Sequence, residues 1–136
     1  MRAISYLAIH CSATPQTTTV ESINSYWKRV LGWRAPGYHF IIKANGEIVQ
    51  LLPIEQISNG VAGYNKNTIN ICYIGGVDRN NKPIDNRTKE QKASLLKVIK
   101  EMKALFPTAI VKGHYQFPNV KKACPSFDAF SEYKLL

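Results

Sequence analysis

The chain has 136 residues, of which 45% are hydrophobic and 20% charged, the size and composition of one ordinary globular domain. No stretch has the polar bias of a disordered segment, no apolar run is long enough to cross a bilayer, and the N-terminus lacks the pattern of a signal peptide. We therefore expect synthesis in the cytoplasm without a signal peptide, and no stable insertion into a membrane. Three cysteines, an odd number, argue against a disulfide framework.

The charge balance is strongly basic, with 18 Lys and Arg against 9 Asp and Glu and a net charge of +9. Such a charge favours anionic partners, which include nucleic acid, acidic membranes and a negatively charged cell wall. The basic residues are spread along the chain without forming a block, so the charge is also compatible with a solvated surface that only aids solubility. Nucleic-acid binding has no support besides the charge, and we expect none.

The first predicted element is a strand over residues 3–11, which are apolar and β-branched and end at a polar run. This strand delivers His10 to its carboxyl end. Thr18 followed three residues later by Glu21 is the signature of a capping box, and apolar residues then recur at helical spacing. The pattern predicts a helix that runs to about Gly32.

A β-hairpin is predicted next. The dipeptide Asn45-Gly46 readily adopts the positive φ of a hairpin turn, and the stretches 38–43 and 47–52 flank it. Residues 68–74 (TINICYI) predict another strand, which ends at two glycines.

A second helix is predicted from Thr88, which forms a capping-box pattern with Gln91, to the neighbourhood of Pro107. Residues 109–112 then predict a short strand that leads into Gly113-His114, and one helical turn is expected after Ser126. Strands interspersed with two long helices indicate an α/β fold of mixed α+β type.

This fold is expected to be a central mixed β-sheet of about five strands flanked by helices. No linker, repeat or low-complexity segment divides the sequence. We therefore expect residues 1–136 to form a single catalytic domain that acts as a monomer.

Three residues have the chemistry of a metal site. His10 and His114 each lie where a predicted strand ends, the usual place for functional side chains in mixed sheets, although either alone is compatible with a structural role. Together with Cys124 they supply two imidazoles and one thiolate. Three protein ligands with an open fourth position are typical of catalytic zinc. The wide separation of the histidines in the sequence argues against a zinc-finger module.

The other two cysteines are predicted to be core residues. Cys11 follows His10 on the same strand, so alternation turns it to the opposite face, and Cys72 lies within an apolar strand. A rival hypothesis makes Cys11 the nucleophile of a thiol peptidase with a histidine base.

Four motifs occur in order along nearly the whole chain: IHCSAT at 9–14, GYHFIIK at 37–43, GYN at 63–65 and KACPSFD at 122–128. Together they resemble the zinc-dependent N-acetylmuramoyl-L-alanine amidases of the superfamily (amidase type 2) that contains phage T7 lysozyme and the peptidoglycan-recognition proteins. Chance agreement of four ordered motifs, which include the candidate ligands His10 and Cys124, is hard to obtain.

The resemblance implies one Zn²⁺ bound by the three residues above and hydrolysis of the amide between the lactyl group of N-acetylmuramic acid and L-alanine. It places Tyr38 and Lys122 beside the metal, where Lys122 could stabilise the oxyanion and Tyr38 could orient water or donate to the same oxygen. It also makes Tyr64 and Asn65 candidate substrate contacts. The expected partner is peptidoglycan or a soluble muropeptide.

Two features depart from the pattern of known zinc hydrolases. No HExxH helix and no glutamate can be tied to the site, so the general base is not identified, and Tyr38 is a weak substitute. Many members of the superfamily have a histidine shortly before the GYN motif, where this chain has residues 58–62 (SNGVA). His39, which alternates away from Tyr38, is interpreted as a structural residue or as support for a ligand.

Several biological roles remain open at the level of sequence. The protein could be a prophage endolysin that reaches the wall after holin-type or other non-standard release, a cytosolic muropeptide-recycling amidase, or a secreted effector. A non-catalytic wall-binding module is the alternative from a different class, and retention of all three ligands speaks against it.

Overall fold

A five-stranded mixed sheet lies at the centre of the molecule, which a computed structural model describes over residues 2–136. The strand order is β3-β2-β4-β1-β5, in which β2, β4, β1 and β5 are parallel and β3 is antiparallel to β2. The strands are Tyr6–Cys11 (β1), Phe40–Ile42 (β2), Ile48–Gln50 (β3), Thr68–Tyr73 (β4) and Ile110–Gly113 (β5). The predicted mixed sheet and the hairpin around Asn45-Gly46 are confirmed.

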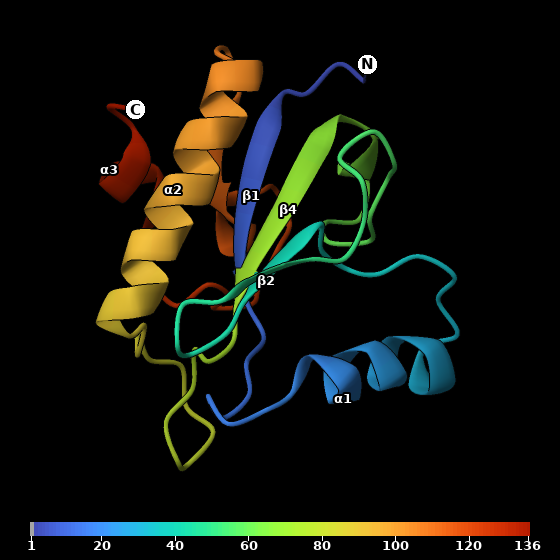
Figure 1. Ribbon diagram of the computed structural model, residues 1–136, viewed down its shortest axis with the longest axis vertical. Coiled ribbons are helices and arrows are strands. Elements are labelled where there is room, and N and C mark those ends of the chain that lie inside the picture. Colours follow the sequence, from blue (N-terminus) through green and yellow to red (C-terminus); the bar gives the residue numbers. More distant parts are fainter. Residues whose placement is uncertain (1) are drawn as a thin grey trace.

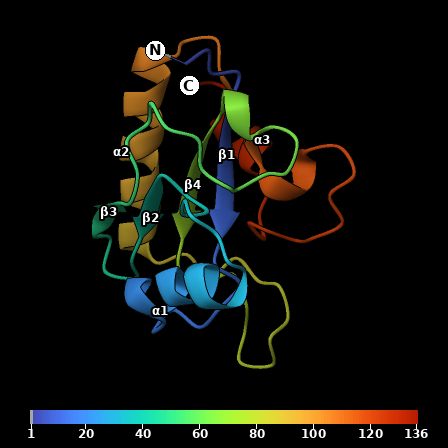
Figure 2. The ribbon, with the colours of Figure 1, turned by 90° about the vertical axis from the view of Figure 1, so that its right-hand side faces the viewer.

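Helices pack on one face of this sheet and at the carboxyl ends of its parallel strands. The long helix α2 packs on one face, and α1 lies across the carboxyl ends of the parallel strands (Figures 1 and 2). The helices are Val20–Ser25 (α1), continued by a π-helical turn at Tyr26–Val30, then Lys89–Leu105 (α2) and Ala129–Tyr133 (α3), with 3-10 turns at Asn65–Asn67 and His114–Gln116. None of the helices within residues 2–136 is both long and apolar enough to span a bilayer.

One of the two predicted capping boxes is present. At the start of α2 the Thr88 side chain accepts a hydrogen bond from the Gln91 N–H, and the Gln91 side chain accepts from the Thr88 N–H. The box predicted for Thr18 and Glu21 is wrong.

The helix α1 instead begins one residue later, with Thr19 as the cap. The Thr19 Oγ1 accepts from the Ser22 N–H at 3.1 Å. Thr18 stays outside the helix because its own N–H donates to the Pro15 carbonyl, which closes a turn. Only Thr18 fits the capping-box pattern, since Ser22 and not Glu or Gln lies three residues after Thr19, but the turn excludes Thr18 and leaves Thr19 as the cap.

Alternation along β1 separates the core from the functional side of the sheet. Leu7, Ile9 and Cys11 belong to the large hydrophobic cluster beneath α2, whereas Ala8 belongs to a cluster on the opposite face. His10 shares the face of Ala8, because side chains two residues apart point the same way. The predicted opposition of Cys11 and His10 is therefore confirmed.

The C-terminal helix α3 is fastened to the rest of the molecule by Arg87. This buried guanidinium donates two hydrogen bonds to Glu132 (2.8 and 2.9 Å) and two to Asp85 (both 2.9 Å), and it stacks 3.5 Å above the centroid of the Phe127 ring. Hydrogen bonds from Arg87 lower the pKa of the Glu132 carboxyl, against the opposing effect of burial. We call Arg87, Asp85, Glu132 and Phe127 the C-terminal latch.

We predict that Arg87→Met lowers the free energy of unfolding by about 2 kcal/mol, because it leaves two carboxylates without their partner. The loss is smaller than for a fully buried pair, since both carboxylates reach water. The loss should shrink in acid, because a lowered carboxylate pKa stabilises the fold above the unfolded pKa and ceases to do so as the pH falls through the folded value. Urea denaturation at neutral and acidic pH measures both effects.

The exposed pair of Lys43 and Glu47, 3.2 Å apart, provides the matched control. Lys43→Met should change the free energy of unfolding by less than about 0.5 kcal/mol. Equal losses of stability in the two variants would contradict the stabilising role of Arg87 in the C-terminal latch.

Candidate metal centre and active site

The two candidate histidine ligands are brought together by parallel strand pairing. His10 is the penultimate residue of β1, and His114 directly follows β5. The register pairs Ile9 with Gly113, so the residues that follow them lie side by side at the same edge of the sheet. The centroids of the two imidazole rings are 4.8 Å apart.

Cys124 completes a cluster with these two rings. One ligand atom from each of His10, His114 and Cys124 lies within 4.8 Å of the others, and the distance from His10 Nδ1 to Cys124 Sγ is 3.8 Å. Tetrahedral zinc with imidazole and thiolate ligands sets neighbouring donor atoms about 3.5 Å apart. The donor set and its spacing therefore fit a zinc ion.

The protonation of His10 also suits a ligand. Burial, followed by the neighbouring His114, lowers the pKa of His10 to about 3, so the imidazole is neutral at neutral pH. Its Nε2 is hydrogen-bonded to Asn70 Oδ1 at 2.8 Å. The nitrogen that faces Cys124 is Nδ1, which leaves a lone pair on the side of the cluster.

The Cys124 thiol is held by the backbone around it. The Cys11 N–H donates to Cys124 Sγ at 3.2 Å, and the Tyr73 hydroxyl donates to the Pro125 carbonyl at 2.6 Å. The neighbouring Cys11 thiol, together with burial, raises the pKa of Cys124 well above its ordinary value. A bound divalent cation reverses this preference and holds the sulfur as thiolate.

The remaining cysteines are core residues, as predicted. Cys72 is fully buried and Cys11 is 4% exposed. The Cys11 sulfur lies 4.0 Å from the Ser126 hydroxyl, whereas the sulfur beside the His10 ring is that of Cys124, 3.8 Å from Nδ1. A thiol–imidazole pair centred on Cys11 is therefore not favoured by the geometry.

The cluster opens into a cavity of about 710 Å³ between α1 and the carboxyl ends of the strands. Tyr38 and Lys122 both line it. The Tyr38 ring is centred 4.9 Å from the His10 ring, and burial raises the pKa of its hydroxyl well above the usual range. Lys122 is exposed. Burial, followed by the charge of Lys122, lowers the pKa of His114. The structure thus brings five predicted site residues to one cavity.

The two predicted substrate contacts lie elsewhere. Tyr64 packs edge-on against Tyr6 and Phe117, and neither Tyr64 nor Asn65 is among the residues that line the cavity. The Asn65 side chain accepts a hydrogen bond from the Val61 N–H at 2.8 Å. Contact of Tyr64 or Asn65 with substrate stays a prediction.

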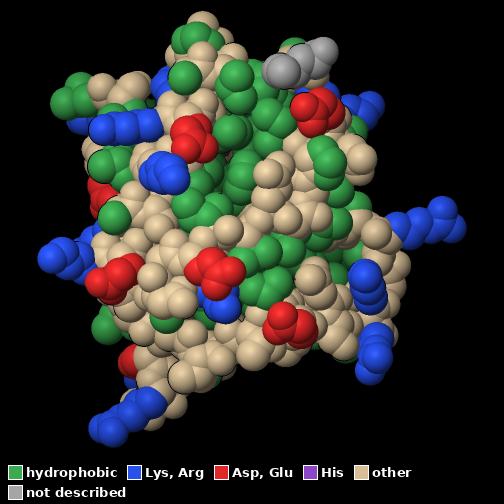
Figure 3. All heavy atoms as spheres, viewed as in Figure 1, with side chains coloured by type: hydrophobic (Ala, Val, Ile, Leu, Met, Phe, Trp, Pro, Cys, Tyr) green, Lys and Arg blue, Asp and Glu red, His purple; other side chains and the backbone are tan. Residues whose placement is uncertain are grey.

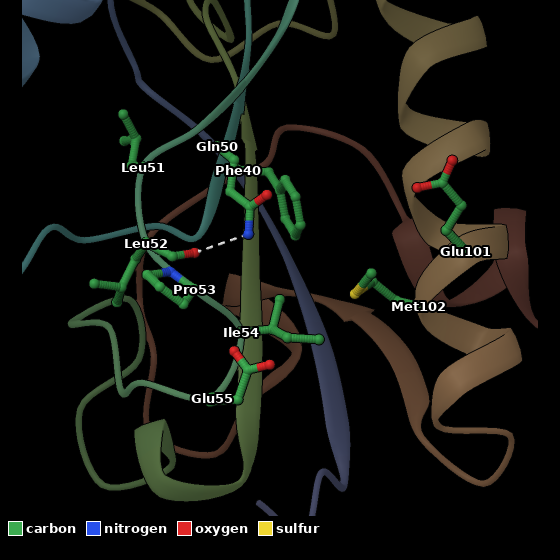
Figure 4. Close-up of a pocket in the computed structure, with 9 residues that line it drawn as sticks. All are labelled: Phe40, Gln50, Leu51, Leu52, Pro53, Ile54, Glu55, Glu101 and Met102. Carbon is green, nitrogen blue, oxygen red and sulfur yellow. Dashed lines mark hydrogen bonds between the residues drawn. The ribbon is translucent and has the colours of Figure 1, made fainter. Parts of the chain in front are cut away.

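A second hollow lies on the face shown in Figure 3, where hydrophobic side chains gather beside α2. Its volume is about 550 Å³, and Figure 4 shows Met102 of α2 pointing toward Ile54 and Phe40 across it. Glu55 and Glu101 are its charged lining residues, and no histidine or cysteine lines it. This hollow is separate from the candidate metal centre and lacks its chemistry.

Comparison with known proteins agrees with the geometry. Residues 1–127 match the family described as N-acetylmuramoyl-L-alanine amidase. The chain belongs to this family. The endolysin of Escherichia phage T7 is 36% identical over 122 residues, which cover 88% of this chain and 79% of that protein. The endolysin of Enterobacteria phage K11 is 34% identical over 122 residues with the same coverage of both chains, 88% and 79%.

Solved structures share the fold of this amidase. The amidase LysCS from Clostridium intestinale superposes with a TM-score of 0.83 at 21% identity, covering 98% of this chain and 83% of that one. Apis mellifera PGRP-SA superposes with a TM-score of 0.80 at 23% identity and the same coverage, 98% and 83%. The predicted membership of the superfamily is confirmed. The enzyme hydrolyses peptidoglycan between the N-acetylmuramoyl group and L-alanine.

Sequence reasoning missed a group of three residues, of which Asn70 contacts His10. Asn70 and Ser58 are fully buried and hydrogen-bonded to each other, and Gly60 packs against the Asn70 side chain. The available signal was a carboxamide in the middle of the strand Thr68–Tyr73, between two isoleucines. A polar residue at such a position requires buried partners.

We predict that the protein, held free of metal by a chelator, loses roughly 3 kcal/mol of stability between pH 7 and pH 5. Burial lowers the pKa of His39 to about 4, and that of His10 to about 3. Both values lie below the pKa of a histidine in the unfolded chain, which is about 6.5. Below that pH the unfolded chain binds protons that the folded chain does not, so the free energy of unfolding falls. Urea denaturation at the two pH values measures the loss.

The ring protons of His10 and His39 should keep their neutral chemical shifts over the same range in NMR spectra. Titration of either ring near its ordinary pKa would contradict this account of the loss.

Proposed function

We propose that this amidase works with one zinc ion held by His10, His114 and Cys124. The observation that carries the proposal is the convergence of three ligand atoms within 4.8 Å at the floor of a cavity. The neutral imidazole of His10 and its Nδ1 beside the Cys124 sulfur support it further. Three protein ligands leave one position for water or substrate, which is typical of catalytic zinc.

The chemistry at the cavity would divide between the metal and two side chains. A bound zinc ion supplies a Lewis acid that lowers the pKa of water and polarises the carbonyl of the scissile amide. The Lys122 ammonium, at the exposed rim, stabilises the negative charge that develops on that carbonyl oxygen. The raised pKa of Tyr38 keeps its hydroxyl protonated, so Tyr38 orients water or donates a hydrogen bond and does not act as a base.

We further propose that the enzyme acts on the intact cell wall, as the name endolysin indicates for its relatives. The net charge of +9 suits approach to an anionic wall. The match over residues 1–127 supports one catalytic domain over this range. Release of peptide from whole sacculi supports wall lysis, whereas activity confined to soluble muropeptides would support recycling.

We predict about one zinc ion per chain in the purified wild-type protein. Cys124→Ala and His10→Ala should each weaken zinc binding by at least about 100-fold, since loss of a group that only supports a ligand already costs about 10- to 100-fold. Both variants should release no free peptide from purified muropeptides. Elemental analysis by mass spectrometry and chromatography of the released peptide are the measurements.

Cys11→Ala is the matched control. Cys11 reaches the Cys124 sulfur through its backbone N–H, which alanine retains, so this variant should keep zinc and peptide release. A different result, in which Cys11→Ala is inactive and the wild type survives chelation, would replace the zinc mechanism with a thiol nucleophile.

We predict that Lys122→Ala lowers kcat by about 10²- to 10³-fold, the usual cost of removing one oxyanion donor. Tyr38→Phe should lower kcat by a smaller factor, and both variants should keep the zinc content of the wild type. Steady-state kinetics on a muropeptide measure the effect. An increase in KM with an unchanged kcat would assign these side chains to substrate binding alone.

A further inference from the structure

We infer that Asn70 is a positioning residue that fixes which ring nitrogen of His10 is free to bind a metal ion. This inference rests on the proposed zinc site. Asn70 is fully buried on β4, opposite Ala8 of β1, and its side chain reaches His10. Oxygen and nitrogen of a carboxamide are interchangeable in shape, so the direction of each hydrogen bond must follow from its neighbours.

The first neighbour is His39, whose protonation is fixed by a backbone donor. The backbone N–H of Asn70 donates to His39 Nδ1 at 3.0 Å. A backbone N–H only donates, so His39 Nδ1 is an acceptor and the ring proton is on Nε2. That Nε2 lies 2.8 Å from the Gln56 carbonyl, which accepts this proton. An Arg2 guanidinium nitrogen lies 3.2 Å from the same Nε2, but its two hydrogens have the Ile54 and Thr68 carbonyls as acceptors, at 2.8 and 3.5 Å.

Ser58 passes this constraint to the Asn70 side chain. The Ser58 hydroxyl lies 3.2 Å from His39 Nδ1, which carries no proton, so the hydroxyl donates to it and shares its lone pair with the Asn70 N–H. Its oxygen then accepts a hydrogen bond from the Asn70 side chain at 2.7 Å. The amide nitrogen of Asn70 therefore faces Ser58, and the amide oxygen faces the other way.

A second backbone donor independently favours the same orientation. The Val61 N–H donates to Asn65 Oδ1 at 2.8 Å, which identifies that atom as oxygen. Asn65 Oδ1 lies 3.5 Å from Asn70 Nδ2 and accepts its second hydrogen at the long limit of a hydrogen bond. Two backbone N–H groups on different segments thus agree on the orientation of the Asn70 amide.

The consequence is a defined tautomer of His10. The Asn70 Oδ1 lies 2.8 Å from His10 Nε2, and an amide oxygen accepts only, so Nε2 bears the proton. His10 Nδ1 then presents its lone pair toward the Cys124 sulfur, 3.8 Å away. The opposite tautomer would direct an N–H at the metal position and prevent ligation.

Gly60 provides the space that Asn70 occupies. A Cβ at Gly60 would lie 2.3 Å from both Cγ and Oδ1 of Asn70. Gly60 is not among the glycines with positive φ, so space and not backbone conformation accounts for this glycine. Gly60 and Asn70 therefore form a matched pair.

The test begins with the wild-type protein in the presence of a chelator. Long-range ¹H–¹⁵N NMR should find the His10 proton on Nε2. In Asn70→Leu the two tautomers should both be populated, and zinc affinity, measured by competition with a chelating dye, should fall by about 10- to 100-fold. Asn70→Asp should restore a single tautomer and near-wild-type affinity, because a carboxylate also accepts the Nε2 proton.

Thr68→Val is the matched control for damage to the strand. Thr68 is also buried on β4, two residues away, and its hydroxyl donates to the Tyr64 carbonyl and not to the His10 network. This variant should keep the wild-type tautomer and zinc affinity. Circular dichroism verifies that each variant is folded.

A double-mutant cycle tests the pairing with Gly60. Gly60→Ala alone should weaken zinc binding as much as Asn70→Gly does, since the new methyl group displaces the amide. Adding Gly60→Ala to Asn70→Gly should cost nothing further, which is strong non-additivity. Additive losses would overturn the pairing.

The outcomes separate this inference from the proposed function. A wild-type protein that binds no zinc overturns the metal site, and the His10 tautomer still decides the role of Asn70. A His10 proton on Nδ1 overturns the inference whatever the zinc result. Zinc binding in Asn70→Leu as tight as in the wild type also overturns it and leaves the amidase mechanism intact.

Discussion

The parallel pairing of β1 with both β4 and β5 is the constraint on which the rest of the site depends. The register sets Ile9 opposite Gly113 and Ala8 opposite Asn70. Because side chains alternate, this single alignment brings His10 beside His114 on one side and within hydrogen-bonding distance of Asn70 on the other. A slip of one residue would turn His10 into the hydrophobic cluster beneath α2. Core packing and ligand placement are therefore set by the same register.

Burial of this much polarity inside a sheet has a cost that the hydrogen bonds offset. His10, His39, Ser58 and Asn70 are all buried, and each has a partner within the group. Unpaired polar groups in such a place would each cost about 1–3 kcal/mol. The group keeps both imidazoles neutral, because burial disfavours their charged form. A rigid, neutral ligand is the state that zinc requires.

The sequence predicted those parts of the molecule that local patterns encode. Strand periodicity located β1 and β4, and strand ends together with ordered motifs singled out His10, His114 and Cys124, which the structure brings together. The first helix start was misplaced by one residue, because Thr18, the threonine with a glutamate three residues later, is held outside the helix by a turn that involves Pro15.

The buried neighbours of His10 lay beyond such patterns. The contact of Asn70 with His10 joins residues 60 apart in sequence, and its contact with Ser58 joins residues 12 apart. Such contacts follow from strand order, which no local period contains. Similarly, a glycine at position 60 was indistinguishable from a loop glycine until the Asn70 side chain was seen to fill the space beside it. Sequence motifs thus identify ligands more readily than the residues that orient them.

The third ligand depends on the fold in a different way from the two histidines. Cys124 comes from a loop and not from a strand, so its position follows from what holds the loop at each end. Before it, His114 leaves β5. After it, Pro125 accepts a hydrogen bond from Tyr73 of β4, and Phe127 lies beneath the Arg87 guanidinium. The C-terminal latch thus lies three residues from Cys124, the proposed third ligand. Because the latch depends on ionised carboxylates and the histidine ligands on neutral imidazoles, acid weakens both supports of the site at once.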